Sequence, residues 1–128
     1  MTSTQLLEFK ELIRSSSNAC QRKPDKQARK LLLYLFTSTR GGFTRLRIIM
    51  MLLESPYNTH QLAKALDLDY KSVQHHIKVL EKNNLVSKIG ERYGAIFHLS
   101  IFLEMNIGAL DEAIDKLSRK MNRTKIYI

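Results

Sequence analysis

The residues between 70 and 83 include polar side chains that can hydrogen-bond to bases and pair with phosphates. At helical spacing, the apolar residues of this segment fall on one stripe and the polar residues fall on the opposite, solvent-facing stripe. Glutamine can read adenine through two hydrogen bonds, lysine can bind guanine or phosphate, and His75 can donate or accept. Tyr70 and Ser72 would lie in the first turn, where the helix dipole favours phosphate. The residues on which we expect nucleic-acid contacts here are Tyr70, Lys71, Ser72, Gln74, His75 and Lys78.

Further basic residues lie on either side of this segment. Lys88 and Arg92 belong to an expected β-hairpin, where they suit contact with phosphates or a minor groove. Arg45 lies at the start of an expected helix and is another candidate for a backbone phosphate. Hairpin tips and helix starts are exposed and polar in most proteins, so each of these residues also has a purely structural interpretation. His76 points about 100° away from His75, and we expect it to be a core or boundary histidine with a local hydrogen bond.

The overall charge of the chain favours a polyanionic partner. The 128 residues include 21 Lys and Arg against 12 Asp and Glu, which gives a formal net charge of +9. Nucleic acid and an anionic membrane surface are the simplest partners for such a charge. The basic residues are not gathered on one helix face, which argues against a membrane. The single Cys excludes a disulfide framework and a Cys-rich zinc site, and the four His are scattered, so we expect no metal and no cofactor.

No segment reads as a targeting or membrane-spanning sequence. The longest apolar run is Ile48–Leu53, far short of the ~20 residues that a membrane-spanning helix needs. Residues 1–14 contain acidic side chains and lack the apolar core of a signal peptide. We therefore expect a soluble, cytoplasmic protein that is associated with the nucleoid.

The polar stripe is positioned by a defined series of expected elements. Apolar spacing predicts helices over residues 4–14, 26–36, 43–54, 59–66 and 70–83, followed by strands at 85–89 and 95–99. Asn58 and Gln61 can form a capping box, Asp69 can cap the next helix, and Asn83-Asn84 can end it. This order predicts a mainly α fold with a small β-hairpin (α+β), namely a winged helix-turn-helix with flanking N- and C-terminal helices.

A last helix is expected after Ser100, with apolar residues at alternating steps of four and three. These residues are Leu103, Ile107, Leu110, Ile114, Leu117 and Met121. The stripe must be buried, either on its twin in a second copy or on the apolar faces of residues 4–14 and 26–36. We favour a homodimer built by this helix, and intrachain packing in a monomer is the alternative. The chain then divides into an N-terminal helical extension (1–39), a winged helix-turn-helix domain (40–100) and a C-terminal dimerisation helix with a basic tail (101–128).

The stretch from Gln61 to Val86 reads QLAKALDLDYKSVQHHIKVLEKNNLV. With the expected hairpin it resembles the winged helix-turn-helix domains of the ArsR-like superfamily, especially archaeal transcription regulators, over residues 40–100. The resemblance implies a homodimeric, sequence-specific DNA-binding protein. It places on recognition-helix positions the residues Lys71, Ser72, Gln74, His75 and Lys78. Metal-sensing members carry a Cys-x-Cys pair near this helix, whereas residues 65–71 contain no Cys, and Asn83-Asn84 stands where relatives usually have Asn-Gly.

These observations predict a transcription regulator that binds specific double-stranded DNA sequences as a homodimer. The helix at 70–83 would enter the major groove, and the hairpin wing at 88–96 would contact the adjacent backbone or minor groove. A non-specific architectural, chromatin-like DNA-binding protein and a protein-interaction module are the alternatives. We expect no enzyme, because no Ser/His/Asp order, Gly-rich phosphate loop or paired-carboxylate pocket is readable. The sequence motifs do not specify the operator sequence, the choice between repression and activation, or a small-molecule effector.

Overall fold

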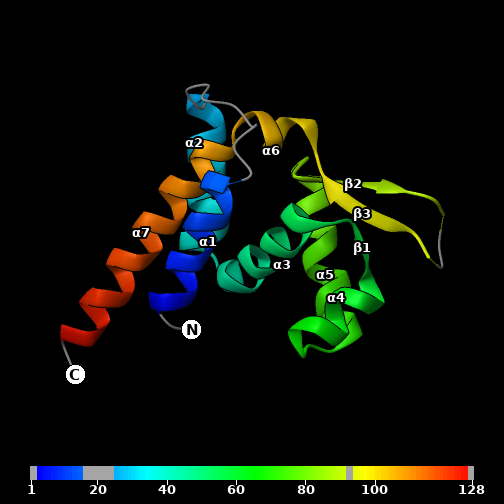
Figure 1. The fold of residues 1–128 in the computed structure, drawn as a ribbon, viewed down its shortest axis with the longest axis horizontal. Coiled ribbons are helices and arrows are strands. Elements are labelled where there is room, and N and C mark those ends of the chain that lie inside the picture. Colours follow the sequence, from blue (N-terminus) through cyan, green and yellow to red (C-terminus); the bar gives the residue numbers. More distant parts are fainter. Residues whose placement is uncertain (1–2, 16–24, 92–93, 127–128) are drawn as a thin grey trace. The chain divides into compact units, whose positions relative to one another are not determined.

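The computed structural model describes residues 3–15, 25–91 and 94–126, and among these the side chains of 4–15, 25–91 and 94–120. The chain divides into two compact units. One unit comprises Gly41–Glu104, and the other combines the two ends of the chain, Met1–Arg40 and Met105–Ile128. The flanking segments that the sequence suggests as separate extensions therefore pack together into one body. Figure 1 shows the helices and strands of both units.

The unit Gly41–Glu104 contains helices and a small sheet in the order expected for a winged helix-turn-helix. Its elements are α3 (Gly42–Glu54), β1 (Tyr57–Asn58), α4 (Thr59–Leu66), α5 (Tyr70–Lys82), β2 (Val86–Ile89), β3 (Ile96–Leu99) and most of α6 (Ile101–Met105). The described strands form an antiparallel sheet in the order β1-β3-β2. Phe97 of β3 pairs with Tyr57 on one side and with Lys88 on the other. The predicted fold class is confirmed, with β1 as a strand that the sequence did not indicate.

Local hydrogen bonds set the limits of α4 and α5. The Asn58 side chain accepts from the Gln61 backbone N–H at 2.8 Å, and the Gln61 side chain accepts from the Asn58 N–H at 2.9 Å. Together these bonds satisfy two of the free donors at the start of α4. Asp69 accepts from the Ser72 N–H at 3.1 Å and caps α5 in the same way. After α5, Asn84 adopts the left-handed conformation with φ +60°, so the capping predictions are confirmed.

Apolar side chains from α3, α4, α5 and the sheet form the core of this unit. Leu46, Ile49, Leu62, Val73, Leu80 and Leu85 are each fully buried. Val73, Ile77 and Leu80 recur on one face of α5 at helical spacing, and that face is held against the other elements. The opposite face of α5 is thereby left to solvent, as the sequence predicts.

The other unit packs α1 (Ser3–Ser15) and α2 (Lys26–Leu33) against α7 (Ile107–Ile126), as Figure 1 shows. A π-helical segment, η1 (Tyr34–Ser38), continues α2. Ion pairs join the helices at their rims. Lys10 pairs with Asp115, and Arg29 Nε lies 2.8 Å from a Glu112 carboxylate oxygen. These pairs add little stability because they are partly exposed, and the buried apolar side chains hold the unit together.

The expected dimerisation stripe is buried inside the chain, which corrects the prediction for these residues. The last helix is interrupted at Asn106, so Leu103 lies on α6 and the rest of the stripe lies on α7. Ile107, Leu110 and Ile114 are at most 4% exposed, and Leu117 is 9% exposed, without any second copy. The packing of α1 and α2 on α7 accounts for this burial. The Met121 side chain lies outside the described part of the chain.

Candidate nucleic-acid interface

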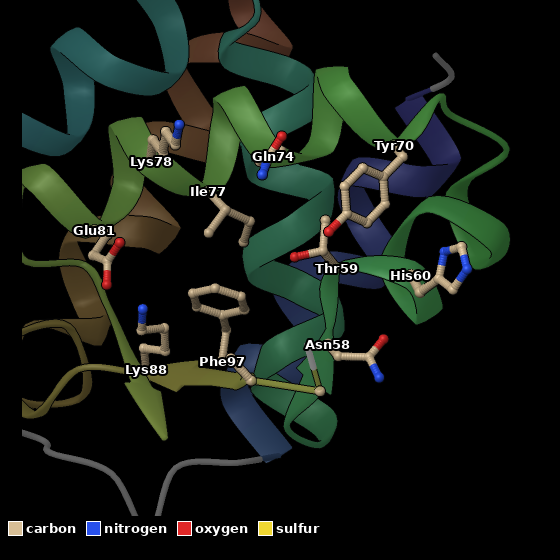
Figure 2. A pocket seen from close by; sticks show the side chains of 12 residues that line it. Asn58, Thr59, His60, Tyr70, Gln74, Ile77, Lys78, Glu81, Lys88 and Phe97 are labelled. Atoms are coloured by element: carbon tan, nitrogen blue, oxygen red, sulfur yellow. The ribbon is translucent and has the colours of Figure 1, made fainter. Parts of the chain in front are cut away.

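A groove runs between α5, the start of α4 and the β2–β3 hairpin. It has a volume of about 610 Å³, and its lining comes from all these elements. Figure 2 shows how Gln74, Lys78 and Tyr70 of α5 and Lys88 of β2 are arranged around it. The structure thus brings together four residues that the sequence singled out separately for nucleic-acid contact.

The remaining predicted residues of α5 lie along its outer side. Lys71 and His75 are exposed, as are Gln74 and Lys78, whereas Ser72 is half-buried. Tyr70 is 44% exposed and its ring meets the His60 ring edge-on, with 5.6 Å between the ring centroids. The outer side of α5 therefore carries amide, imidazole and ammonium groups that are free to reach a partner.

Asp69, which caps α5, is also the negative group closest to its start. Hydrogen bonds from the Ser72 side chain and backbone lower the pKa of the Asp69 carboxyl. The carboxylate therefore stays ionised and the first turn of α5 stays capped at neutral pH. The cap holds the first residues of the exposed face in place.

The hairpin contributes Lys88 to the groove and two apolar side chains to solvent. Ile89 and Ile96 face each other across the strands and are 60% and 40% exposed. Because successive residues of a strand alternate between faces, this isoleucine pair lies on the face opposite to Lys88 and Phe97. Arg92, which the sequence suggested for a phosphate or minor-groove contact, lies outside the described residues.

Arg45 is not available for a phosphate, which corrects the prediction for this residue. Its side chain is 6% exposed, and Arg45 Nη1 lies 3.2 Å from His76 Nδ1 on α5. The position is the fourth residue of α3, on the side of the helix that faces α5. The neighbouring Arg47 also has a structural contact, because it donates to the Leu66 carbonyl at 3.2 Å and lies over the Phe43 ring.

His76 is the boundary histidine that its position on the helix predicts. It is half-buried and shares a hydrogen bond with Arg45. Burial lowers the pKa of His76, and the positive charges of Arg45 and His75 lower it further. The ring is therefore neutral at physiological pH.

Several groove residues were missed by the sequence analysis. Asn58, Thr59 and His60 reach the groove from the start of α4, and Phe97 reaches it from β3. No spacing rule connects these residues with α5, because they come from other elements. Glu81 is different, since it lies seven residues after Gln74 and three after Lys78 on the same helical stripe, and helical spacing could have identified it.

Within the described residues, no group of three or more His, Cys, Asp or Glu side chains is placed to hold a metal ion. The helices of the described ranges are also too short or too polar to cross a membrane.

Comparisons with known proteins identify the central part of the chain. Residues 43–88, which span α3 to β2, match the family model described as bacterial regulatory protein, arsR family. A solved structure, reduced HlyU from Vibrio cholerae N16961, is 22% identical and matches with a TM-score of 0.51, covering 73% of this chain and 88% of that chain. This likeness supports the fold. A comparison with curated proteins found no match. Residues 43–88 are therefore similar to the helix-turn-helix of ArsR-family regulatory proteins.

Proposed function

We propose that this protein regulates transcription by binding specific double-stranded DNA sequences, with α5 in the major groove and the hairpin wing at 88–96 on the adjacent backbone or minor groove. The observation that carries the proposal is the common location of Gln74, Lys78 and Lys88. They come from two separate elements and line one open groove. A major groove is about wide enough for one α-helix, and α5 offers its polar side to solvent along its whole length.

The roles of the side chains follow from their chemistry. Gln74 reads an adenine through its amide, and Lys78 binds guanine or a phosphate. Lys71 and Lys88 contact phosphates on either side of the groove. His75 contacts a base edge or a phosphate. Tyr70 and Ser72 lie in the first turn of α5, where backbone N–H groups favour a phosphate.

The balance of charge in the groove favours a polyanion. Lys78 and Lys88 line it together with a single acidic residue, Glu81, among the lining residues that the structure describes. The whole chain carries a formal charge of +9. Neutralisation of phosphates by such lysines releases counterions, so affinity for DNA falls steeply with salt.

A homodimer completes the proposed function. Two copies related by a two-fold axis would read two half-sites one helical turn apart and gain affinity and specificity from both. The α7 stripe is already covered by α1 and α2. In the same unit, Leu7 is 60% exposed and Tyr34 is 58% exposed, so apolar surface remains there for a second copy. Sedimentation equilibrium of the wild type and of Leu7→Lys tests the dimer and this surface.

A salt titration of affinity for random duplex DNA tests the proposed function. We expect a steep loss of affinity with salt, and Lys78→Gln and Lys88→Gln each flatten the logarithmic slope by up to about one unit. Lys116→Gln, which removes an exposed lysine of α7, is the matched control for loss of one charge. Unchanged slopes for Lys78→Gln and Lys88→Gln, or slopes no flatter than that of the control, contradict the groove assignment.

Selection of bound sequences from a random pool then separates the candidate functions. A palindromic consensus supports a dimeric regulator that reads two half-sites. Salt-sensitive binding without a consensus supports a non-specific architectural protein. Failure to bind duplex DNA at low salt contradicts the proposal. It favours the alternative in which the winged helix is a protein-interaction module.

A further inference from the structure

Gly41, Arg45 and His76 form a contact between α3 and α5 that the proposed DNA contacts do not use. Arg45 is buried, with Nη1 at 3.2 Å from His76 Nδ1. A guanidinium carries only donors, so His76 Nδ1 must accept this hydrogen bond. The ring is then neutral and holds its proton on Nε2. A doubly protonated ring has no acceptor to offer Arg45, and it would place a second positive charge beside the guanidinium.

Gly41 closes the space around this pair. Its backbone adopts φ +102°, and a Cβ at this position would lie 2.7 Å from His76 Cε1 and 3.2 Å from Arg45 Nη1. Real Cβ atoms do not approach other atoms as closely as 2.7 Å. The backbone before α3 therefore lies directly against the imidazole, and the ring has little room to move away from Arg45 while α5 stays in place.

His76, the α5 member of this contact, is the immediate neighbour in sequence of a residue on the exposed side of α5. His75 is exposed beside it, with its ring centroid 5.5 Å from that of His76. Gln74 and Lys78 line the groove two residues before and two residues after His76. Because α5 is a rigid helix, the rotation that His76 fixes against α3 also fixes the direction in which these side chains point.

We propose that His76 is a positioning residue for α5: its neutral ring, held by buried Arg45 and the Gly41 backbone, keeps the DNA-contacting side chains in register, and protonation of the ring weakens duplex binding. The proposal rests on the proposed function, because it concerns how α5 meets DNA. It adds a dependence of duplex affinity on pH that arises from the packing of α5 rather than from a DNA contact.

The groups around His76 determine the sign of this dependence. Arg45 from α3 and His75 from α5 both oppose a positive charge on the ring. Of the charged residues on the elements packed against α5, Arg47 of α3 donates to the Leu66 carbonyl, His60 and Lys64 of α4 line a surface hollow beside Tyr70, and Lys88 of β2 lines the groove.

Burial and these charges lower the pKa of folded His76 below the ordinary histidine value of 6.5. The unfolded chain therefore binds more protons in this range. The contribution of neutral His76 to the free energy of unfolding is complete above about pH 6.5. It is lost as the pH falls from there towards the lowered pKa of the folded state.

Substitution of His76 by Asn provides the test. The Asn Oδ1 occupies nearly the position of Nδ1, accepts a hydrogen bond from Arg45 and does not titrate. We expect the ratio of duplex affinities, His76→Asn over wild type, to be about one at about pH 7.5 and to rise as the pH falls below about 6.5, reaching less than about tenfold at about pH 5.5 because the pKa of folded His76 lies below 6.5. His75→Asn is the matched control, because it replaces the neighbouring exposed imidazole and leaves the Arg45–His76 contact in place, and its ratio should not rise in the same way. His76→Leu, which leaves Arg45 without this acceptor, should bind about tenfold or more weakly at both pH values.

The outcomes separate this proposal from the proposed function. A His76→Asn ratio that stays near one down to a pH at which nitrogen-detected NMR shows the wild-type His76 ring to be protonated, with duplex binding retained, overturns the positioning role alone. Absence of duplex binding by the wild type at about pH 7.5 overturns both. Should His76→Asn fail to fold, nitrogen-detected NMR of the wild type decides the matter. A proton on Nδ1, or titration of this ring above the ordinary histidine pKa of about 6.5, contradicts the proposal.

Discussion

Ile114→Ala will destabilise the fold of the isolated chain rather than merely separate two copies. Ile114 is fully buried in a single copy, in the unit where α7 packs against α1 and α2. Truncation of a buried isoleucine to alanine costs about 2–5 kcal/mol, and truncation to valine costs about 0.5–1.5 kcal/mol. The loss is a large fraction of the about 5–15 kcal/mol by which a typical domain is stable.

Urea unfolding followed by far-UV circular dichroism measures this effect. With a slope of about 1–3 kcal/mol per molar urea, a loss of about 2–5 kcal/mol lowers the unfolding midpoint of the alanine variant by about 0.7–5 M. Ile101→Ala is the matched control, because Ile101 is a helical isoleucine with 74% of its surface exposed, and its effect should stay within about 0.5 kcal/mol. Measurements at protein concentrations about 100-fold apart separate unfolding of one chain from dissociation.

The opposite result would refute the intrachain assignment of the stripe. If Ile114 were buried only between two copies, Ile114→Ala would yield a monomer with the unfolding free energy of wild-type monomer. The difference between variant and wild type would then appear only at concentrations where wild type is dimeric. A graded loss from Ile114→Val to Ile114→Ala at all concentrations supports the packing described above.

Three further substitutions test the DNA-binding unit. Gln74→Ala should relax sequence preference at one base pair by about 1–3 kcal/mol while affinity for random duplex stays nearly unchanged, as measured by selection from a random pool; an unchanged consensus would show that Gln74 reads no base. Asn58→Ala removes the α4 capping box with Gln61 and should cost about 1 kcal/mol in urea unfolding, whereas Asn58→Ser, which keeps a capping oxygen, should recover most of it. Gly41→Ala should lower the thermal midpoint, because alanine is strained at φ +102° and its Cβ would collide with His76; a midpoint at or above that of wild type contradicts the close approach.

Local signals were sufficient to predict the elements that carry the candidate interface. The start of α4 follows from Asn58 and Gln61, and the start of α5 follows from Asp69, because capping depends on residues three apart. The apolar stripe of α5 also predicted which side chains face solvent. These properties need no knowledge of the rest of the chain.

Long-range packing explains what the sequence could not predict. Tyr57 and Asn58 form a strand only because Phe97 and Ile96 lie beside them. Arg45 is buried because an imidazole from another helix accepts its hydrogen bond, a pairing that helix periodicity does not reveal. The α7 stripe illustrates the same limit: spacing shows that a stripe must be covered, but it does not identify the covering surface.

The division of the chain has a consequence for folding during synthesis. The unit of α1, α2 and α7 is built from both ends of the chain, and the whole segment Gly41–Glu104 lies between them. At about 5–20 residues per second, a ribosome needs about 3–13 s to make that segment. During this interval α1 and α2, which pack against α7 in the finished unit, lack that partner. The unit of α1, α2 and α7 can therefore be completed only after the whole segment Gly41–Glu104 has been made.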